Sequence, residues 1–517
     1  MYKLADKWIS IVTVAIIVFA LIFTSAPVSY AKDLPAEKVS SAGTGPADVT
    51  AGISAEDWEQ IIGLMGDSYE QQAYLKASNP GGGDYFGASV AIDGDTLVVG
   101  AYGESSDGTG PGNDAADDAG AAYVFVRSGE TWTQQAYLKA SNPESDDRFG
   151  CSVAIDGDTI VVGAYAEDSG DKNDEENNGA SNAGAAYVFV RSETSWTQQA
   201  YLKSCNIDPE DNFGWSVAVD GDFIVVGATG EDCDGSSKTN NDASMSGAAY
   251  VYVRSGDFWV YKSFLKASTI EALDFFGFSV AIDGDTIVVG AYGEDSDGTN
   301  EANNDAENSG AAYVFVFDGV FWKHKAYLKA SNAEIKDYFG DSVAIDGDTI
   351  VVGASGENSD GTSPDNNDED SAGAAYVFVN SGTAWTQQAY LKADNAGEYD
   401  NFGYSVCIDG DTIVAGAAGE SSDGSSPDND DEMESGAAYV FTRSGGIWVQ
   451  QDYLKSTTID ASDYFGFSVD IDGETIVVGA YAEDGDGSGE DDNSAEYAGA
   501  AYVFKALSKA YLPLIMK

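Results

Sequence analysis

The dipeptide Phe-Gly recurs along the chain at a nearly constant interval, and this recurrence constrains the fold more than any other feature. It begins at Phe86, Phe149, Phe213, Phe276, Phe339, Phe402 and Phe465, with steps of 63 or 64 residues. A fixed period of this length is typical of one supersecondary unit that repeats around an axis or along a line. The 517 residues are therefore expected to contain seven copies of one unit rather than several unrelated domains.

Each copy contains four segments of strand character separated by turn signals. In the fourth copy these segments read SVAI, TIVVGA, AAYVFV and KHKAYLKA. Asp283-Gly284 joins the first two segments and suits a type I′ turn, which makes them antiparallel neighbours. A short turn that ends near Trp322 joins the last two into a second hairpin. Four such strands per unit predict an all-β fold, a seven-bladed β-propeller with four antiparallel strands in each blade.

One strand is surplus, and it predicts how the ring closes. The segment typified by Ala-Tyr-Leu occurs eight times, once more than Phe-Gly. The copy from Tyr69 to Lys76 has the full pattern, whereas the copy around Tyr511 lacks the preceding Trp and Gln pair. We therefore expect Tyr69 to Lys76 to complete the last blade, so that both ends of the repeat region pair and leave no open sheet edge.

The segments outside the repeats predict export. Residues 1–31 carry Lys3 and Lys7, an apolar stretch, and Ser29-Tyr30-Ala31 as a signal-peptidase site. A retained membrane anchor is the alternative, because the stretch is nearly long enough to span a bilayer. Residues 32–68 are expected to be a linker with a possible short helix, residues 69–505 the propeller, and residues 506–517 a tail of unknown role. The predicted location is secreted or at the cell surface.

The net charge of the chain limits the classes of partner that it can bind. With 25 Lys and Arg against 87 Asp and Glu, the net charge is −62, which repels nucleic acid and anionic lipid. Membrane association is expected only through an uncleaved N-terminal segment. The bulk charge is compatible with cationic or neutral partners, and it equally fits an acidic surface that is adapted to salty surroundings.

The four cysteines occupy different positions in the repeat. A disulfide between Cys205 and Cys233 stays open as an alternative in an exported protein.

The loop between the second and third strands is acidic in every copy and supplies the candidate site. A glutamate begins each loop, at Glu104, Glu167, Glu231, Glu294, Glu357, Glu420 and Glu483. An aspartate follows, at Asp107, Asp171, Asp234, Asp297, Asp360, Asp423 and Asp486. Most copies then add an Asn-Asp pair, ending at Asp114, Asp174, Asp242, Asp305, Asp368 and Asp430. These are the oxygen ligands that calcium prefers, so the pattern predicts calcium in these loops. A solvated loop that only keeps the protein soluble is the alternative.

The order of Phe-Gly, Val-Gly-Ala and Gly-Ala-Ala-Tyr-Val-Phe resembles the FG-GAP repeat family, which includes the N-terminal propeller of integrin α subunits. The signature SVAIDGDTIVVGA is most similar to the bacterial exported branch, and the resemblance covers residues 69–505. In the integrin-like repeats, calcium occupies a longer loop between the first two strands. Here that connection is only Asp-Gly-Asp or Asp-Gly-Glu, so the family's metal site does not transfer. The constant repeat length also leaves no room for an inserted ligand-binding domain.

The sequence offers little for catalysis. Its single histidine, His324, stands in the fourth strand of one copy, where other copies have Gln. Catalytic triads, zinc clusters and phosphate-binding loops have no matching motif. We therefore predict that the chain is not an enzyme but an exported, calcium-binding adhesion or recognition propeller, whose acidic loops bind an extracellular protein or glycan. A structural cell-surface component and a glycan-active hydrolase with a pair of carboxylates are the alternatives.

Overall fold

A computed structural model describes residues 68–507, apart from Pro111, Glu176, Lys238, Thr239, Asp365, Asp428, Ile459, Glu490 and Asp491. These residues form one compact unit, Ser68–Leu507. The predicted export signal, nearly all of the linker and the tail from residue 508 lie outside the described residues. In the described part of the chain, no helix is long and apolar enough to cross a membrane.

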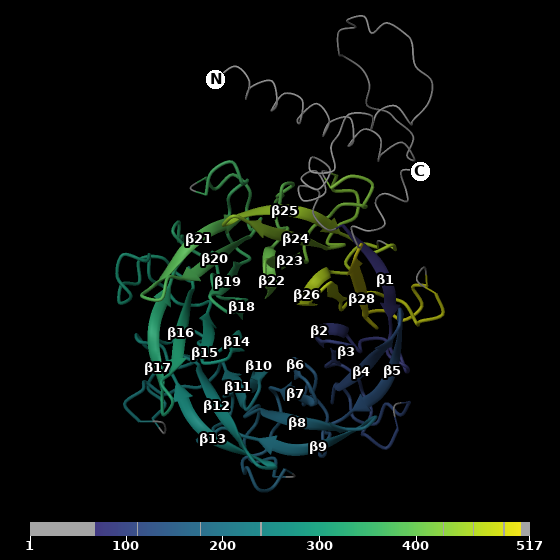
Figure 1. Ribbon diagram of the computed structural model, residues 1–517. Helices are drawn as coiled ribbons and strands as arrows, with labels where there is room; N and C mark the ends of the chain where they lie inside the picture. Colours follow the sequence, from purple (N-terminus) through teal and green to yellow (C-terminus); the bar gives the residue numbers. More distant parts are fainter. Residues whose placement is uncertain are drawn as a thin grey trace, which may run out of the picture. The chain divides into compact units, whose positions relative to one another are not determined.

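The described chain is a ring of seven four-stranded antiparallel sheets, as the repeat predicted (Figure 1). The first strand of each blade lies nearest the axis; these are β2 (Phe86–Asp93), β6 (Val153–Asp156), β10 (Phe213–Asp220), β14 (Val280–Asp283), β18 (Val343–Asp346), β22 (Phe402–Asp409) and β26 (Phe465–Asp472). The second strands are β3 (Thr96–Ala101), β7 (Thr159–Ala164), β11 (Phe223–Ala228), β15 (Thr286–Ala291), β19 (Thr349–Ala354), β23 (Thr412–Ala417) and β27 (Thr475–Ala480).

The two outer positions of each blade complete the sheets. The third strands are β4 (Ala121–Ser128), β8 (Ala185–Ser192), β12 (Ala248–Ser255), β16 (Ala311–Phe317), β20 (Ala374–Asn380), β24 (Ala437–Ser444) and β28 (Ala500–Ala506). The outermost strands are β5 (Thr131–Leu138), β9 (Ser195–Leu202), β13 (Phe258–Leu265), β17 (Trp322–Leu328), β21 (Trp385–Leu391), β25 (Ile447–Leu454) and, in the last blade, β1 (Tyr69–Leu75).

The ring closes by pairing the two ends of the repeat region, which confirms the prediction from the surplus strand. β1 pairs antiparallel with β28, with Tyr69 opposite Ala506 and Leu75 opposite Ala501. Two carboxylates that replace alanine, serine or cysteine of the other copies support this joint. Asp452 Oδ2 accepts the Tyr69 N–H at 2.7 Å, and Asp470 Oδ2 accepts the Ile92 N–H at 2.7 Å.

The hydrophobic core lies between neighbouring blades rather than inside one sheet. One cluster joins Phe149 and Tyr187 of the second blade to Val98 and Val124 of the first. Phe149 and Tyr187 pack edge to face, with ring centroids 5.3 Å apart. Gly100 allows this close approach, because a Cβ there would lie 2.0 Å from the Gly150 carbonyl oxygen of the next blade. The recurring aromatic and small residues therefore pack neighbouring blades together.

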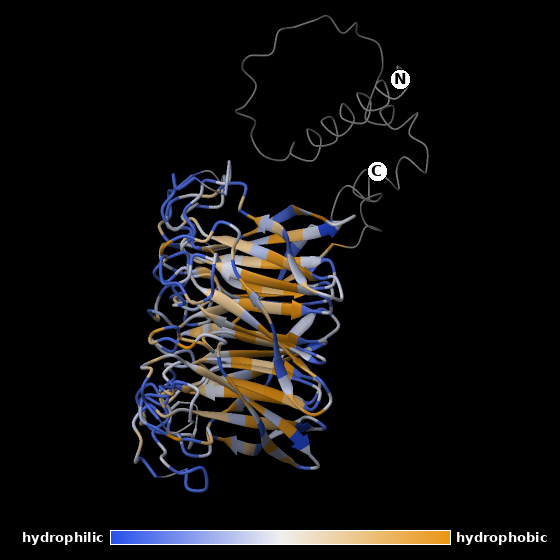
Figure 2. Ribbon diagram, turned by 90° about the vertical axis from the view of Figure 1, so that its left-hand side faces the viewer, coloured by the Kyte–Doolittle hydropathy of each residue, from blue (hydrophilic) through white to orange (hydrophobic). Residues whose placement is uncertain are grey.

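The strand order separates the connections onto two faces of the ring. One face, here the loop face, carries the long loops between second and third strands and the connections from each blade to the next. The opposite, turn face carries the Asp-Gly turns and the turns between third and fourth strands. Figure 2 shows the long hydrophilic loops gathered on one side of the apolar strands.

The four cysteines are free thiols. Cys233 is buried in a loop on the loop face, whereas Cys205 is exposed. The disulfide between them that the sequence left open is therefore absent.

Candidate functional site

The glutamate that begins each acidic loop is buried at the root of the loop. In the second blade, Glu167 is 1% exposed. Its Oε2 accepts a hydrogen bond from Lys203 Nζ at 2.7 Å, and its Oε1 accepts from Tyr201 at 2.9 Å and from Asn142 Nδ2 at 3.2 Å. Burial lowers the pKa of Lys203, and the neighbouring Glu167 carboxylate opposes that shift. The carboxylate therefore joins its loop to the end of the outermost strand of the same blade.

The same ion pair recurs in six blades. The distance from the lysine Nζ to the glutamate Oε2 is 2.5 to 2.8 Å in each pair. The pairs are Lys76–Glu483, Lys139–Glu104, Lys203–Glu167, Lys329–Glu294, Lys392–Glu357 and Lys455–Glu420. The third blade differs, and Phe264 stands there in place of the tyrosine. There Lys266 donates to Ser246 Oγ, and Glu231 accepts from Asn206 and Tyr250 at 2.6 Å.

The second acidic position lies at the exposed tip of the loop. In the fourth blade, Asp297 Oδ1 accepts from Thr299 N at 2.9 Å, Thr299 Oγ1 at 2.6 Å and Asn303 Nδ2 at 2.6 Å. These hydrogen bonds lower the pKa of Asp297 to about 2, so this carboxylate is ionised throughout the physiological range. The pKa is lowered in the same way at Asp107, Asp234, Asp360, Asp423 and Asp486. In the second blade, Asp171 instead accepts from Asn173.

The third acidic position is exposed in every blade that has it, at Asp114, Asp174, Asp242, Asp305, Asp368 and Asp430. The structure thus separates the three predicted positions, since the glutamates are buried at the loop roots, six of them paired with lysine, and the aspartates stand at the tips. Among the residues that the structure describes, no three His, Cys, Asp or Glu side chains form a group suited to a metal ion.

A further buried aspartate, missed in the sequence, stands two residues before each Phe-Gly pair. These residues are Asp84, Asp147, Asp211, Asp274, Asp337, Asp400 and Asp463. Asp147 Oδ2 accepts the Glu144 N–H at 2.8 Å, which shapes the connection between blades. Burial raises the pKa of Asp147 to about 8, opposed by that hydrogen bond. The fixed offset from Phe-Gly is the sequence signal that identifies the set.

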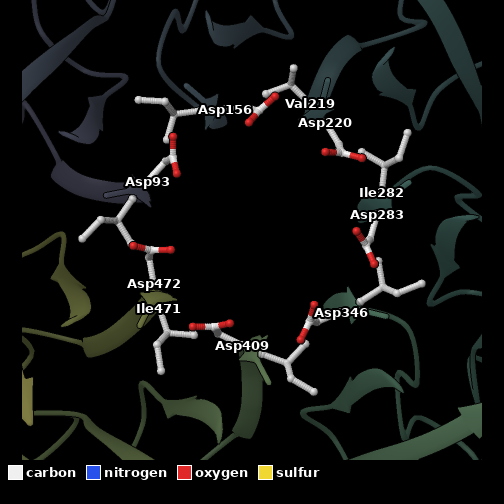
Figure 3. Close-up of a pocket in the computed structure, with 14 residues that line it drawn as sticks. Asp93, Asp156, Val219, Asp220, Ile282, Asp283, Asp346, Asp409, Ile471 and Asp472 are labelled. Carbon is white, nitrogen blue, oxygen red and sulfur yellow. The ribbon is translucent and has the colours of Figure 1, made fainter. Parts of the chain in front are cut away.

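Seven aspartates from the Asp-Gly turns converge on the axis at the turn face (Figure 3). Asp93, Asp156, Asp220, Asp283, Asp346, Asp409 and Asp472 line an opening of 210 Å³ together with the preceding Ile or Val residues. Each carboxylate accepts the glycine N–H of the next blade's turn, as Asp156 does from Gly221 at 2.7 Å. Burial raises the pKa of Asp220 and Asp472, and neighbouring aspartates add to the shift. Each Asp-Gly turn by itself is too short to hold an ion. The closed ring brings the seven carboxylates together, and there they connect neighbouring blades.

Other aspartates of the turn face are paired with arginine. Asp158 Oδ1 lies 2.6 Å from Arg191 Nε, and Arg191 also donates to Thr96 Oγ1 of the preceding blade at 2.8 Å. Arg127, Arg254 and Arg443 repeat this pairing with Asp95, Asp222 and Asp411. No salt bridge among the described residues includes an aspartate of the acidic loop tips.

The family profile of the FG-GAP repeat matches seven segments, residues 69–125, 132–189, 196–252, 259–315, 322–378, 385–441 and 448–504. The chain belongs to the FG-GAP repeat family. Each matched segment begins with the outermost strand of one blade and continues through three strands of the next, so the first FG-GAP repeat supplies the closing strand β1. No curated protein matches the sequence of the chain.

Membership of the FG-GAP repeat family fits a recognition or adhesion type of protein. Repeats of this family occur in extracellular or surface proteins, and their propellers are typically recognition domains without catalysis. The single histidine, His324, is exposed on the outermost strand β17, where its ring lies 5.5 Å from that of Phe315.

Proposed function

We propose that the chain is an exported recognition propeller that binds an extracellular protein or glycan through its loop face, with calcium held by the tip aspartates of the acidic loops. The observation that carries this proposal is the state of those aspartates. They are exposed or partly exposed, and no Lys or Arg of the described chain forms a salt bridge with them. Hydrogen bonds lower the pKa of Asp297 and of the equivalent aspartate in five other blades.

The loop face has an ordered framework for such binding. Hydrogen bonds link the acidic loops to the segment that enters the same blade. For example, Ser268 Oγ donates to Glu301 at 2.9 Å, and Asn493 Nδ2 donates to Asp460 at 3.2 Å. Carboxylates on a common framework repel one another, and a divalent cation reduces that repulsion. Calcium accepts carboxylate, amide and backbone oxygens together with water, so exposed tips suit it better than the occupied glutamates at the roots.

Thermal unfolding of the full chain tests the calcium part of the proposal. A cation that binds only the native state must raise the unfolding midpoint. We expect a higher midpoint in millimolar calcium than in excess chelator, and a smaller gain in magnesium. Asp297→Asn combined with Asp360→Asn should reduce the gain. Asp285→Asn, at an exposed aspartate of the turn face, is the matched control and should leave it intact. An equal midpoint in calcium and chelator would overturn the calcium assignment.

A glycan array and a pull-down from extracellular material, each with calcium or with chelator, test recognition. A ligand lost in the Asp297→Asn and Asp360→Asn variant but kept by Asp285→Asn would support binding through the loop face. Ligand binding that is insensitive to the loop-face substitutions would place recognition elsewhere.

A further inference from the structure

A second cavity lies toward the opposite end of the blades from the aspartate ring. It has a volume of 330 Å³ and is lined by Phe278, Tyr292, Tyr338, Asp341, Ser355 and Tyr404. These residues belong to the fourth, fifth and sixth blades and flank the loop-face ends of their first and second strands. We call this space the aromatic cavity.

The repeat does not dictate the composition of the aromatic cavity. The position after each Phe-Gly pair carries Ala88, Cys151, Trp215, Phe278, Asp341, Tyr404 and Phe467 in successive blades. Only the fifth blade has a carboxyl group at this position, and the blades on either side of it have an aromatic residue there. A position that varies this freely within a strict repeat is not fixed by the packing between blades.

The aromatic side chains form a contiguous wall. The rings of Phe278 and Tyr292 lie 4.4 Å apart between centroids at an interplanar angle of 62°, and those of Tyr292 and Tyr338 lie 5.9 Å apart at 63°. The ring of Trp215 does not line the cavity but lies 5.5 Å from that of Phe278. The face of an aromatic ring is electron-rich, and a cation in the cavity beside such rings is attracted to it.

Asp341 is incompletely satisfied in this apolar setting. Its Oδ2 accepts the Ser355 N–H at 3.1 Å. Its Oδ1 is buried and accepts no hydrogen bond from any described residue. Gly353 lies beside it, since a Cβ at Gly353 would be 3.1 Å from Oδ1. Burial raises the pKa of Asp341 to about 7, with the hydrogen bonds from Ser355 acting in the opposite direction. A cation in the cavity would stabilise the ionised form.

We propose that the aromatic cavity binds a small organic cation with an alkylammonium group, whose charge is balanced by Asp341 and whose alkyl part packs against Phe278, Tyr292, Tyr338 and Tyr404. The cavity volume suits a small molecule, and apolar walls with one placed polar group are typical of ligand sites. The net charge of −62 adds a general attraction for cations. The site is separate from the calcium proposed at the loop tips and does not depend on it.

The pH dependence of binding follows from the groups in the cavity. Besides Asp341, the titratable groups that line it are the phenols of Tyr292, Tyr338 and Tyr404. Burial raises the pKa of Tyr292 and Tyr404, so these phenols stay neutral. An alkylammonium ion, like lysine, remains protonated below about pH 9. Affinity should therefore rise as Asp341 ionises, by about tenfold between pH 6 and pH 8.

Titration calorimetry of the full chain in excess chelator tests the site with n-butylammonium as the probe and 1-butanol as its neutral counterpart. We expect one butylammonium per chain, a change in Trp215 fluorescence on binding, and at least tenfold weaker binding of 1-butanol. Asp341→Asn should weaken butylammonium at least tenfold and remove the pH dependence. The matched control is Asp346→Asn, which makes the same charge change at the turn-face end of β18, the strand that begins two residues after Asp341. It should bind as the unsubstituted chain does.

Tyr404→Ala provides a second variant that leaves the carboxyl group in place, and its side chain is 39% exposed, so folding should tolerate it. It should weaken butylammonium several-fold. Equal binding of 1-butanol and butylammonium, or equal loss in Asp341→Asn and Asp346→Asn, would overturn the proposal. So would binding of a neutral sugar at this cavity without binding of butylammonium. Because calcium is excluded throughout, failure here is distinct from failure of the loop-tip proposal.

Discussion

The two faces of the ring carry aspartates and glutamates at equally regular positions, yet these carboxylates have different partners. On the turn face, Asp156 accepts a backbone N–H of the next blade and Asp158 pairs with Arg191. On the loop face, Glu167 pairs with Lys203, whereas Asp171 at the loop tip accepts hydrogen bonds from Asn173 of its own loop. A repeated carboxylate therefore has a structural role where a donor from another segment meets it, whereas the loop-tip aspartates accept hydrogen bonds within their own loops.

The sharpest test of this distinction is the buried pair at the loop root. Both Lys203 and Glu167 side chains are almost fully buried, at 0% and 1% exposure. Lys203→Met should lower the free energy of unfolding by about 3 to 5 kcal/mol, because it leaves an uncompensated charge in the interior. Denaturant unfolding at pH 7 measures the loss.

The double variant with Lys203→Met and Glu167→Gln provides the control for that loss. It should recover a large part of the stability, because no unpaired charge remains. At the loop tip, Asp171→Asn should change stability by less than about 0.5 kcal/mol in chelator. Similar losses of stability in the Lys203→Met and Asp171→Asn variants would contradict the different roles of the loop root and the loop tip.

The buried aspartates before each Phe-Gly pair predict a pH effect with a definite sign. The folded pKa of Asp147, about 8, lies above the unfolded value of about 4. The native state therefore binds more protons between these values, and stability falls as pH rises through that window. Asp147→Asn should reduce the slope of unfolding free energy against pH by up to about 1.4 kcal/mol per pH unit.

Urea unfolding at several values between pH 5 and pH 7 measures this slope. Asp146→Asn is the matched control, because this neighbouring side chain is exposed. A slope that is equal in the Asp147→Asn and Asp146→Asn variants would show that Asp147 is not the titrating group.

The smallest expected effect is at the turn face. Arg191→Met should destabilise the chain by about 1 kcal/mol, since Asp158 is 70% exposed and the exposed pair is screened by water. Part of the loss comes from the hydrogen bond to Thr96 and from the guanidinium group over the Trp196 ring, 5.1 Å from its centroid. The loss should shrink in high salt in denaturant unfolding, and a loss as large as that of Lys203→Met would be inconsistent with this view.

Much of the fold could be predicted because its signals are local. The period of Phe-Gly predicts the number of blades, the Asp-Gly turns pair the first two strands, and the surplus Tyr69 strand indicates the closure. The candidate site was harder to predict from the sequence. The acidic pattern of the loops predicts that carboxylates gather on one face, but not that Glu167 meets Lys203, which lies 36 residues further along the chain.

The sequence by itself determined the ring, its closure and the face on which each loop lies, because strand alternation and turn residues act between near neighbours in the chain. Only the tertiary structure decided which carboxylates are paired, how seven separate Asp-Gly turns form one ring at the axis, and that Asp341 stands among aromatic side chains of three blades. The physical reason is convergence on the axis. It brings together side chains from different repeats, and burial and hydrogen bonding then set the charge state of each carboxyl group.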